Sequence, residues 1–313
     1  MNTATSSAVS SVDELAKSYR WCEDVARSQA KNFYYSFVLL PFVKRKAMCA
    51  IYAFMRYCDD LSDDEGIADR AASIGQWRAD LQAALSGKAP SGAGSNVWPA
   101  FIDTVTRFKI PHQYFFEMID GVSSDLGPRH IQTFDELYAY CYRVASVVGL
   151  TIIHIFEFSD PQALELAEKC GIAFQLTNIL RDVKEDSEKQ RVYLPAEDLA
   201  RFGVSPATFA PADAFRRLMA FEADRARTYF DKSQPLIAMV SWRSRASLEA
   251  LILIYSRLLD KIVASDYDVL ARRVRLSTPA KLWLLVRSAR EEIGLVFVLA
   301  LGVFAILLGV LRH

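Results

Sequence analysis

Two pairs of aspartates are the residues of this chain best suited to chemistry: Asp59 with Asp63, and Asp182 with Asp186. Each pair is spaced i,i+4 in an otherwise apolar stretch, so on a helix its two carboxylates share one face, roughly 6 Å apart. Two such charges repel by about 3 kcal/mol at an effective dielectric constant of about 20. Divalent cations held between two such helices would offset this repulsion and bind a phosphate-bearing ligand. A solvated helix face is the alternative for either pair taken alone.

The first pair ends a polar stripe on a helix that is otherwise too apolar to be exposed. Residues 47–58 contain one charged side chain, Arg56, which is unusual for a surface helix. Tyr52, Arg56 and the two aspartates fall at i, i+4, i+7 and i+11, on one face. Buried polar groups need partners, so this stripe indicates a site. An ion pair between Arg56 and Asp59 is the simplest use of the arginine.

The second pair repeats this design with different neighbours. Gln175 and Asn178 precede Asp182 and Asp186 on one face of the run 170–186. The amide of Asn178 could offer its oxygen to a cation or its nitrogen to a phosphate, and Arg181 could bind phosphate oxygens. Together the two stripes predict a metal site, with a structural polar network as the alternative.

Four segments resemble signatures of the squalene/phytoene synthase family. The two DxxxD motifs of that family resemble DDLSD at 59–63 and NILRDVKED at 178–186. Its YCxxVAxxVG segment resembles YCYRVASVVG at 140–149, and the end of its second signature resembles RVYLP at 191–195. Ser146 stands where many members have glycine, whereas every DxxxD aspartate is present. The resemblance covers the chain from about residue 20 to about residue 285.

The resemblance implies an all-α fold, a single-domain helical bundle of the class I isoprenoid synthase type with a central cavity, formed by residues 12–290. It implies that Mg²⁺ or Mn²⁺ helps to join two prenyl diphosphates head to head. The metal ligands would be Asp59, Asp63, Asn178, Asp182 and Asp186. The catalytic residues would be Tyr52, Arg56, Tyr140 and Arg181. The substrate contacts would be Phe33, Arg56, Tyr140, Gln175, Asn178, Arg181, Arg191 and Tyr193.

Two farnesyl diphosphates are the substrates that the resemblance favours. The FYYSF segment at 33–37 and the Asp59-Asp60 form of the first motif resemble bacterial members that make presqualene diphosphate or squalene, in a hopanoid or sterol-type pathway. Squalene formation would require NADPH. The RVRLS segment at 273–277 fits phytoene synthases nearly as well, so coupling of two geranylgeranyl diphosphates in a carotenoid pathway is the alternative. A membrane-tethered protein that binds prenyl lipids or assists assembly is the non-enzymatic alternative.

Composition excludes several other classes of protein. The 37 basic and 37 acidic residues balance, so no net charge attracts nucleic acid. A hydrophobic content of 52% over 313 residues is enough for one large domain with a well-buried core. Five cysteines without CxxC spacing argue against a disulfide framework or a zinc site and fit a reducing compartment.

The two ends of the chain differ in character. Residues 1–11 are rich in Ser, Thr and Ala, which predicts a flexible tail. Residues 293–311 are 19 positions without a charge, and as a helix they would be about 28 Å long, close to the thickness of a bilayer. We expect a C-terminal transmembrane anchor here, with a buried core helix as the alternative. The catalytic domain would then face the cytoplasm, in contact with membrane lipid and with downstream terpenoid enzymes.

Hydrophobic periodicity predicts helices throughout and gives no reason to expect a strand. The expected helices are 12–30, 42–64, 67–85, 97–109, 112–125, 133–158, 161–187, 212–238, 244–265 and 279–311. Residues 86–96 and 187–211 are expected to be irregular, and the second of these segments to close over the site. Aromatic side chains that are expected to line the cavity, exclude water and stabilise an allylic cation are Phe33, Phe37, Phe54 and Phe174.

Overall fold

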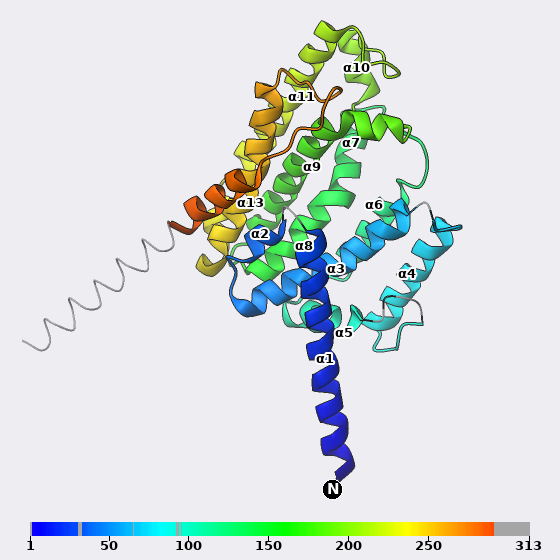
Figure 1. The fold of residues 1–313 in the computed structure, drawn as a ribbon, viewed down its shortest axis with the longest axis vertical. Helices are drawn as coiled ribbons and strands as arrows, with labels where there is room; N and C mark the ends of the chain where they lie inside the picture. Colours follow the sequence, from blue (N-terminus) through cyan, green and yellow to red (C-terminus); the bar gives the residue numbers. More distant parts are fainter. Residues whose placement is uncertain (1, 31–32, 65, 92–93, 95, 291–313) are drawn as a thin grey trace, which may run out of the picture.

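The protein is a helical bundle in the computed structural model, which describes residues 2–30, 33–64, 66–91, 94 and 96–290 (Figure 1). The proposed membrane anchor at 293–311 lies outside these residues. The helices are α1 (Asn2–Gln29), α2 (Phe33–Phe37), α3 (Phe42–Asp63), α4 (Arg70–Leu85), α5 (Trp98–Arg107), α6 (Gln113–Ser123), α7 (Phe134–Cys141), η1 (Tyr142–Ser146), α8 (Val147–Phe156), α9 (Gln162–Glu188), α10 (Ala196–Phe202), α11 (Ala212–Ser233), α12 (Leu236–Met239) and α13 (Trp242–Ala264). Residues 278–290 are also helical.

Most of these helices lie where the periodicity of the sequence predicts them. The first helix begins at Asn2 and not at residue 12. The short helix α2 was not predicted, and α10 lies within the stretch 187–211 that was expected to be irregular. The expectation that the chain contains no strand was wrong. Two short strands, β1 (Arg129–His130) and β2 (Arg191–Val192), form a parallel pair.

This strand pair joins two loops that the sequence separates widely. Arg129 is in register with Arg191, and His130 with Val192. The backbone after α6 is therefore held against the backbone after α9. A helical pattern cannot reveal such a short pairing, since two residues show no periodicity.

Helix α9 lies inside the bundle, packed against α8, α11, α13 and η1 (Figure 1). Gly171 allows the close approach to η1: a Cβ at this position would lie 2.5 Å from the Cα of Ser146. η1 is a π-helical turn between α7 and α8, a geometry that often marks functional sites. The expected single helix 133–158 is thus interrupted in its middle.

The side of α3 that lies opposite its polar stripe packs into an aromatic cluster. Phe54 of α3 stacks on Trp77 of α4 and Phe101 of α5, with ring centroids 5.2 and 4.3 Å apart. Phe115 of α6 meets Phe54 edge to face at 5.6 Å. Phe54 is fully buried in this cluster and is not among the residues that line the cavity between α3 and α9, so the prediction that it lines the cavity is wrong. The cluster instead fixes α3 against its neighbours, which sets the direction of the polar stripe.

One described stretch, 134–156, is long and apolar enough to cross a membrane. Half of its most apolar window is buried. It comprises α7, η1 and α8, which lie within the bundle (Figure 1). This is the environment of a core helix.

Candidate active site

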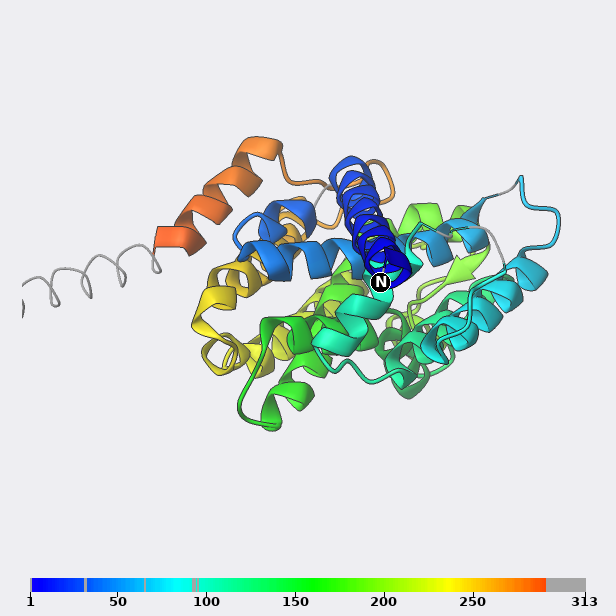
Figure 2. The same ribbon diagram turned by 90° about the horizontal axis from the view of Figure 1, so that it is seen from below.

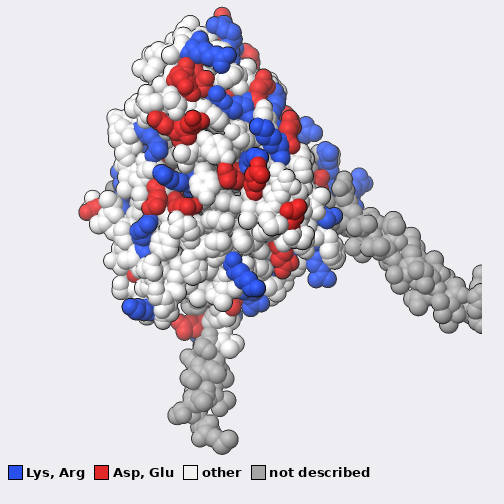
Figure 3. Space-filling model, turned by 180° about the vertical axis from the view of Figure 1, so that it is seen from behind, with Lys and Arg blue, Asp and Glu red and all other residues white. Residues whose placement is uncertain are grey.

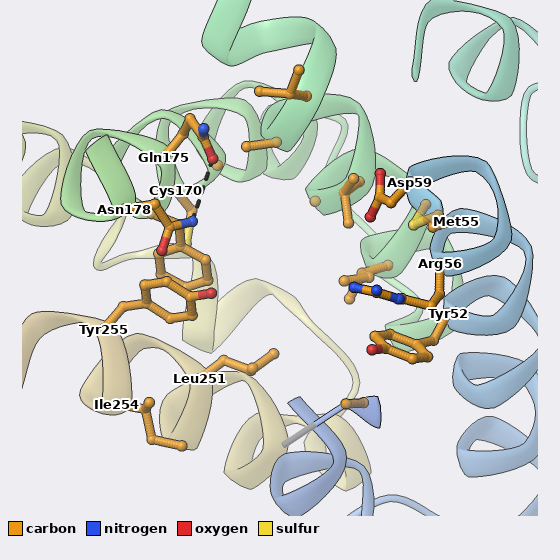
Figure 4. Close-up of a pocket in the computed structure, with 18 of the residues that line it drawn as sticks. Tyr52, Met55, Arg56, Asp59, Cys170, Gln175, Asn178, Leu251, Ile254 and Tyr255 are labelled. Atoms are coloured by element: carbon orange, nitrogen blue, oxygen red, sulfur yellow. Dashed lines mark hydrogen bonds between the residues drawn. The ribbon is translucent and has the colours of Figure 1, made fainter. Parts of the chain in front are cut away.

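A large cavity of about 880 Å³ lies between α3 and α9, within the size range of small-molecule sites. Figure 4 shows Tyr52, Arg56 and Asp59 of α3 on one side of it. Gln175 and Asn178 of α9 lie on the other side, beside residues of α13. The α3 stripe and the first part of the α9 stripe, Gln175 and Asn178, thus face a common space.

The lining of the cavity combines a charged set with a larger apolar set. The charged and amide side chains are Gln29, Arg56, Asp59, Asp63, Asp125, Gln175, Asn178, Arg181, Arg191, Arg273, Arg275 and Lys281. Apolar and aromatic side chains, including Phe37, Met48, Ile51, Ile152, Phe156, Phe174, Leu251 and Leu258, make up most of the remainder. The expectation that Phe37 and Phe174 line the cavity is confirmed. Phe33 belongs to α2, but its side chain is not among those that the structure describes.

The α3 stripe forms as its spacing predicts, although its ion pair does not. Arg56 donates a hydrogen bond to Asp60, one residue beyond the expected partner Asp59. Burial raises the pKa of Asp59 to about 7, and nearby Arg56 only partly counteracts this rise. A carboxylate with so high a pKa lacks sufficient positive charge around it.

The α9 stripe offers a neutral oxygen and a second acidic group. The Nδ2 of Asn178 donates to Gln175 Oε1 at 3.3 Å, which leaves the buried Asn178 Oδ1 without a partner. Asp182 accepts hydrogen bonds from Arg181 Nε at 2.7 Å and pairs with Arg273 Nη2 at 2.9 Å. Asp182 does not line the cavity.

Asp186 lies one turn further along α9, in a small adjoining pocket that also contains Arg191. Burial raises the pKa of Asp186 to about 7, with a further contribution from the charge of Asp182. Asp59 and Asp186 therefore share one property: desolvation raises the pKa of each carboxyl group, and the positive charge nearby only partly offsets this rise.

The carboxyl ends of α3 and α9 meet. Asp63 Oδ1 lies 3.9 Å from Lys189 Nζ and 4.0 Å from Arg191 Nη1. The two acidic pairs are consequently at the same end of the cavity and not on opposite surfaces. Among the described residues, no group of three His, Cys, Asp or Glu side chains is close enough to hold a metal ion unaided.

Asp125 is a site residue that the sequence does not reveal. Its carboxylate accepts hydrogen bonds from the hydroxyls of Tyr140 at 2.8 Å and Tyr193 at 2.9 Å. Its backbone oxygen accepts from Arg191 Nη2 at 2.5 Å. Its charge contributes to the raised pKa values of both Asp59 and Asp186. Asp125 therefore lies between the two stripes.

Tyr140 and Tyr193 are held in place by hydrogen bonds to Asp125 and lie outside the lining of the cavity. Their rings stack with centroids 4.8 Å apart, and Arg129 lies over the ring of Tyr140 at 4.7 Å. Neither ring lines the cavity. Burial raises the pKa of Tyr140 well above its ordinary value, so both hydroxyls act as hydrogen-bond donors to Asp125. Their direct contact with substrate stays a prediction.

Comparison with known proteins identifies the family. Residues 26–280 match the profile described as Squalene/phytoene synthase. A 15-cis-phytoene synthase of Synechococcus elongatus is 34% identical, over 86% of this chain and 91% of its own. Phytoene synthase 2 of Solanum lycopersicum is 36% identical, over 86% of this chain and 88% of its own.

Solved structures show the same fold. A dehydrosqualene synthase superposes with a TM-score of 0.82 at 29% identity, covering 91% of this chain and 99% of its own. The squalene synthase HpnC from Alicyclobacillus acidocaldarius gives a TM-score of 0.75 at 28% identity, covering 81% and 96%. The expected isoprenoid synthase bundle is therefore confirmed. The chain belongs to the squalene/phytoene synthase family of head-to-head prenyltransferases.

Proposed function

We propose that this enzyme couples two farnesyl diphosphates into presqualene diphosphate, with Mg²⁺ or Mn²⁺ bound at the acidic end of the cavity. The observation that carries the proposal is the composition of one cavity: carboxylates and arginines from α3, α9 and residue 273 gather beside a long apolar lining. A diphosphate suits the charged set and an isoprenoid chain suits the apolar set.

The residues present fit a hard divalent cation. The pKa values of Asp59 and Asp186, both about 7, indicate carboxyl groups with too little positive charge around them. The unpartnered Oδ1 of Asn178 is a neutral oxygen of the kind that Mg²⁺ accepts. Asp63 and Asp182 would complete the ligand set. When bound, the cations would neutralise charge that develops on the leaving diphosphate.

Four arginines can supply further charge to the same diphosphate. Arg56, Arg181, Arg191 and Arg273 all line the cavity. The Nε atoms of Arg56 and Arg191 are buried without a hydrogen-bond partner, so each retains a donor for phosphate oxygen. Charge-assisted hydrogen bonds from these groups would be stronger than neutral ones. We assign them to binding the diphosphate and stabilising its departure.

The apolar lining would protect the cation that remains when the C–O bond breaks and its electron pair leaves with diphosphate. Phe174 stacks on Tyr255 with ring centroids 4.2 Å apart, and Phe174 lines the cavity. Aromatic faces attract cations, and the lining excludes water. The C2–C3 double bond of the second substrate would then attack this carbon, and loss of a proton would close the cyclopropane ring. We assign Tyr52, which lines the cavity beside Arg56, to this region.

Two geranylgeranyl diphosphates are the second candidate pair. Curated relatives at 34–36% identity are phytoene synthases, which favours the longer substrate. The matched structures are named as dehydrosqualene and squalene synthases, whose products derive from two farnesyl chains. NADPH would be required only if the enzyme converts presqualene diphosphate to squalene.

The test is product analysis of the purified protein with each substrate, with and without Mg²⁺ and NADPH. Asp59→Asn and Asp182→Asn are expected to abolish turnover while circular dichroism shows unchanged helix content. Asp64→Asn is the matched control, because Asp64 is exposed and its side chain accepts a local hydrogen bond from Gly66 N at 2.8 Å. Turnover like that of the wild type in either site variant would refute the metal role. A product made only from the longer substrate would favour the second candidate.

We also infer that residues 293–311 anchor the enzyme to a membrane, with the catalytic domain on the cytoplasmic side. The basis is the sequence: 19 positions without a charge are long enough to span a bilayer. Both substrate and product carry long isoprenoid chains, so a membrane position would bring the enzyme close to downstream terpenoid enzymes. Fractionation of cells that express the full chain tests this inference.

A further inference from the structure

Most large apolar side chains that the described structure exposes lie on three segments. They are Val38, Phe42, Val43, Trp242, Leu282, Trp283 and Val286. Their exposed fractions lie between 47% and 61%. The three segments are 38–46, 242–245 and 278–290, and we call the surface that these seven residues form the apolar end.

These segments adjoin one another although they are far apart in sequence. Lys44 Nζ donates a hydrogen bond to Ser244 Oγ at 3.0 Å, which joins the start of α3 to the start of α13. Helix α2 packs on α13. Figures 1 and 2 both place the helical segment 278–290 at the same end of the molecule as α2 and the start of α13. The exposed residues therefore form one surface.

The segment 278–290 is apolar on two faces. Leu284 and Leu285 are buried, with exposed fractions of 3% and 8%. Leu282, Trp283 and Val286 point away from the bundle and remain exposed. A helix on the surface of a water-soluble protein normally has one apolar face, which packs on the core. The second, exposed apolar face of 278–290 therefore indicates an apolar partner.

The charged residues of the three segments themselves have one sign, and Glu157, which pairs with Lys44 at 2.8 Å, is an acidic neighbour. None of the three segments contains an acidic residue, and all three contain lysine or arginine. Each exposed ring has a cation near it: Lys46 lies 4.5 Å from the centre of Phe42, Arg243 lies 5.1 Å from that of Trp242, and Arg287 lies 5.9 Å from that of Trp283. Figure 3 shows Lys and Arg side chains along this side of the molecule, with some Asp and Glu side chains between them.

This combination is typical of a bilayer interface. Tryptophan and phenylalanine enter the boundary between head groups and acyl chains, while basic side chains attract anionic lipids. The cavity also approaches this end, because its lining includes Phe37 beside Val38 and Lys281 beside Leu282. Beyond Arg290 the sequence continues through Glu291 and Glu292 into the uncharged run 293–311. Charge, aromatic content and chain continuity thus all favour a lipid bilayer as the partner of the apolar end.

We propose that the apolar end docks on the surface of a bilayer that contains anionic lipids, with Phe42, Trp242 and Trp283 inserted among the head groups. The docked surface would bring the isoprenoid side of the cavity next to the lipid phase. This contact is made by the folded domain and is separate from any anchor that residues 293–311 provide. It does not depend on which prenyl diphosphate the enzyme uses.

Tryptophan quenching by brominated lipid tests the proposal on the full chain. The chain has five tryptophans, Trp21, Trp77, Trp98, Trp242 and Trp283, and residues 291–313 contain none. The anchor itself therefore contributes no tryptophan to the signal, and Trp242, which is distant from it in sequence, reports on the folded domain. In phosphatidylcholine–phosphatidylglycerol vesicles with brominated acyl chains, we expect emission of the wild type to be quenched. The double variant Trp242→Phe/Trp283→Phe is expected to lose most of that quenching.

Trp21→Phe is the matched control, because Trp21 lies on α1, outside the three segments, and it should leave the quenching unchanged. Lys46→Ser/Arg287→Ser should reduce the quenching, and vesicles of phosphatidylcholine alone should do the same. Turnover of substrate dispersed in detergent should be retained in all these variants, which separates docking from catalysis.

Three outcomes would overturn the proposal. The first is emission that brominated lipid does not quench. The second is equal quenching in the wild type and the double tryptophan variant. The third is a stable dimer in detergent that the double variant dissociates, which would show that a second copy of the chain covers the apolar end.

Discussion

Replacing Gly171 by alanine tests the close packing of α9 on η1. A Cβ at this position would lie 2.5 Å from Ser146 Cα, 2.8 Å from Ser146 N and 2.9 Å from the carbonyl oxygen of Ala145. Carbon atoms normally approach to about 3.5–4.0 Å, so the two helices must separate by roughly 1 Å. All three neighbours are backbone atoms, and no change of rotamer can relieve the contact.

The magnitude follows from two opposing terms. Overpacking costs about 1–3 kcal/mol, and more where the backbone itself must move. Alanine in a helix is favoured over glycine by about 1 kcal/mol. We therefore expect Gly171→Ala to lower the free energy of unfolding by about 2 kcal/mol. At roughly 2–4 °C per kcal/mol for a large domain, Tm should fall by about 4–8 °C.

Gly75→Ala is the matched control, since Gly75 is also inside a helix but has no atom within 4 Å of the added Cβ. Only the propensity term remains there, so Tm should rise by about 2–4 °C. Differential scanning calorimetry of both variants measures the two shifts. Because Gly171 lines the cavity, its variant should also lose turnover. Equal or higher stability of Gly171→Ala relative to Gly75→Ala would refute the packing argument.

Three further predictions concern other parts of the molecule. Asp125→Asn keeps the shape of the side chain but can no longer accept from both Tyr140 and Tyr193; the loss of one charge-assisted hydrogen bond, about 1.5–3 kcal/mol, should lower kcat roughly 10–100-fold, and an unchanged kcat would contradict its positioning role. Burial raises the pKa of Glu222 from 4.5 to about 7, so between these pH values the folded form retains a proton that the unfolded form releases. The stability that this proton provides is on the order of 3 kcal/mol. It is complete below about pH 4.5 and is lost as the pH rises through about 7. Glu222→Gln should remove this part of the pH dependence in urea titrations, whereas an identical slope would exclude Glu222 as its source. Deletion of residues 293–313 should convert a protein that only detergent extracts into one that high salt releases from membranes, and release of the full chain by salt alone would contradict the anchor.

The helices and the two stripes could be predicted from sequence because they are local patterns. Spacing of i,i+4 and i,i+7 fixes which side chains share a helix face, and Tyr52, Arg56 and Asp59 of α3 do line the cavity together. The partner of Arg56 could not be predicted in the same way. Asp59 and Asp60 are both within reach of the arginine, and the choice depends on how α3 is rotated against its neighbours.

Asp125 could not be found by any local pattern. It follows α6 in a loop and has no acidic neighbour at helical spacing. Its importance comes from three partners that tertiary packing brings to it: Tyr140, Tyr193 and Arg191. The parallel pairing of β1 with β2 produces this convergence. The sequence signal at 191–195 marked the β2 side of this contact. No sequence signal marked the other side, where Asp125 and β1 lie.

The π-helical turn η1 has a consequence for how the binding chamber can be altered. A turn closed by i→i+5 bonds contains one residue more than an α-helical turn, and each residue advances the helix by about 100°. The inward orientation of Val148 and Ile152 therefore depends on that additional residue. Loss of one position within 142–146 would rotate α8 and turn these side chains out of the chamber. Natural or engineered changes in product length should thus arise by substitution along α8, whereas single-residue deletions there should be incompatible with activity.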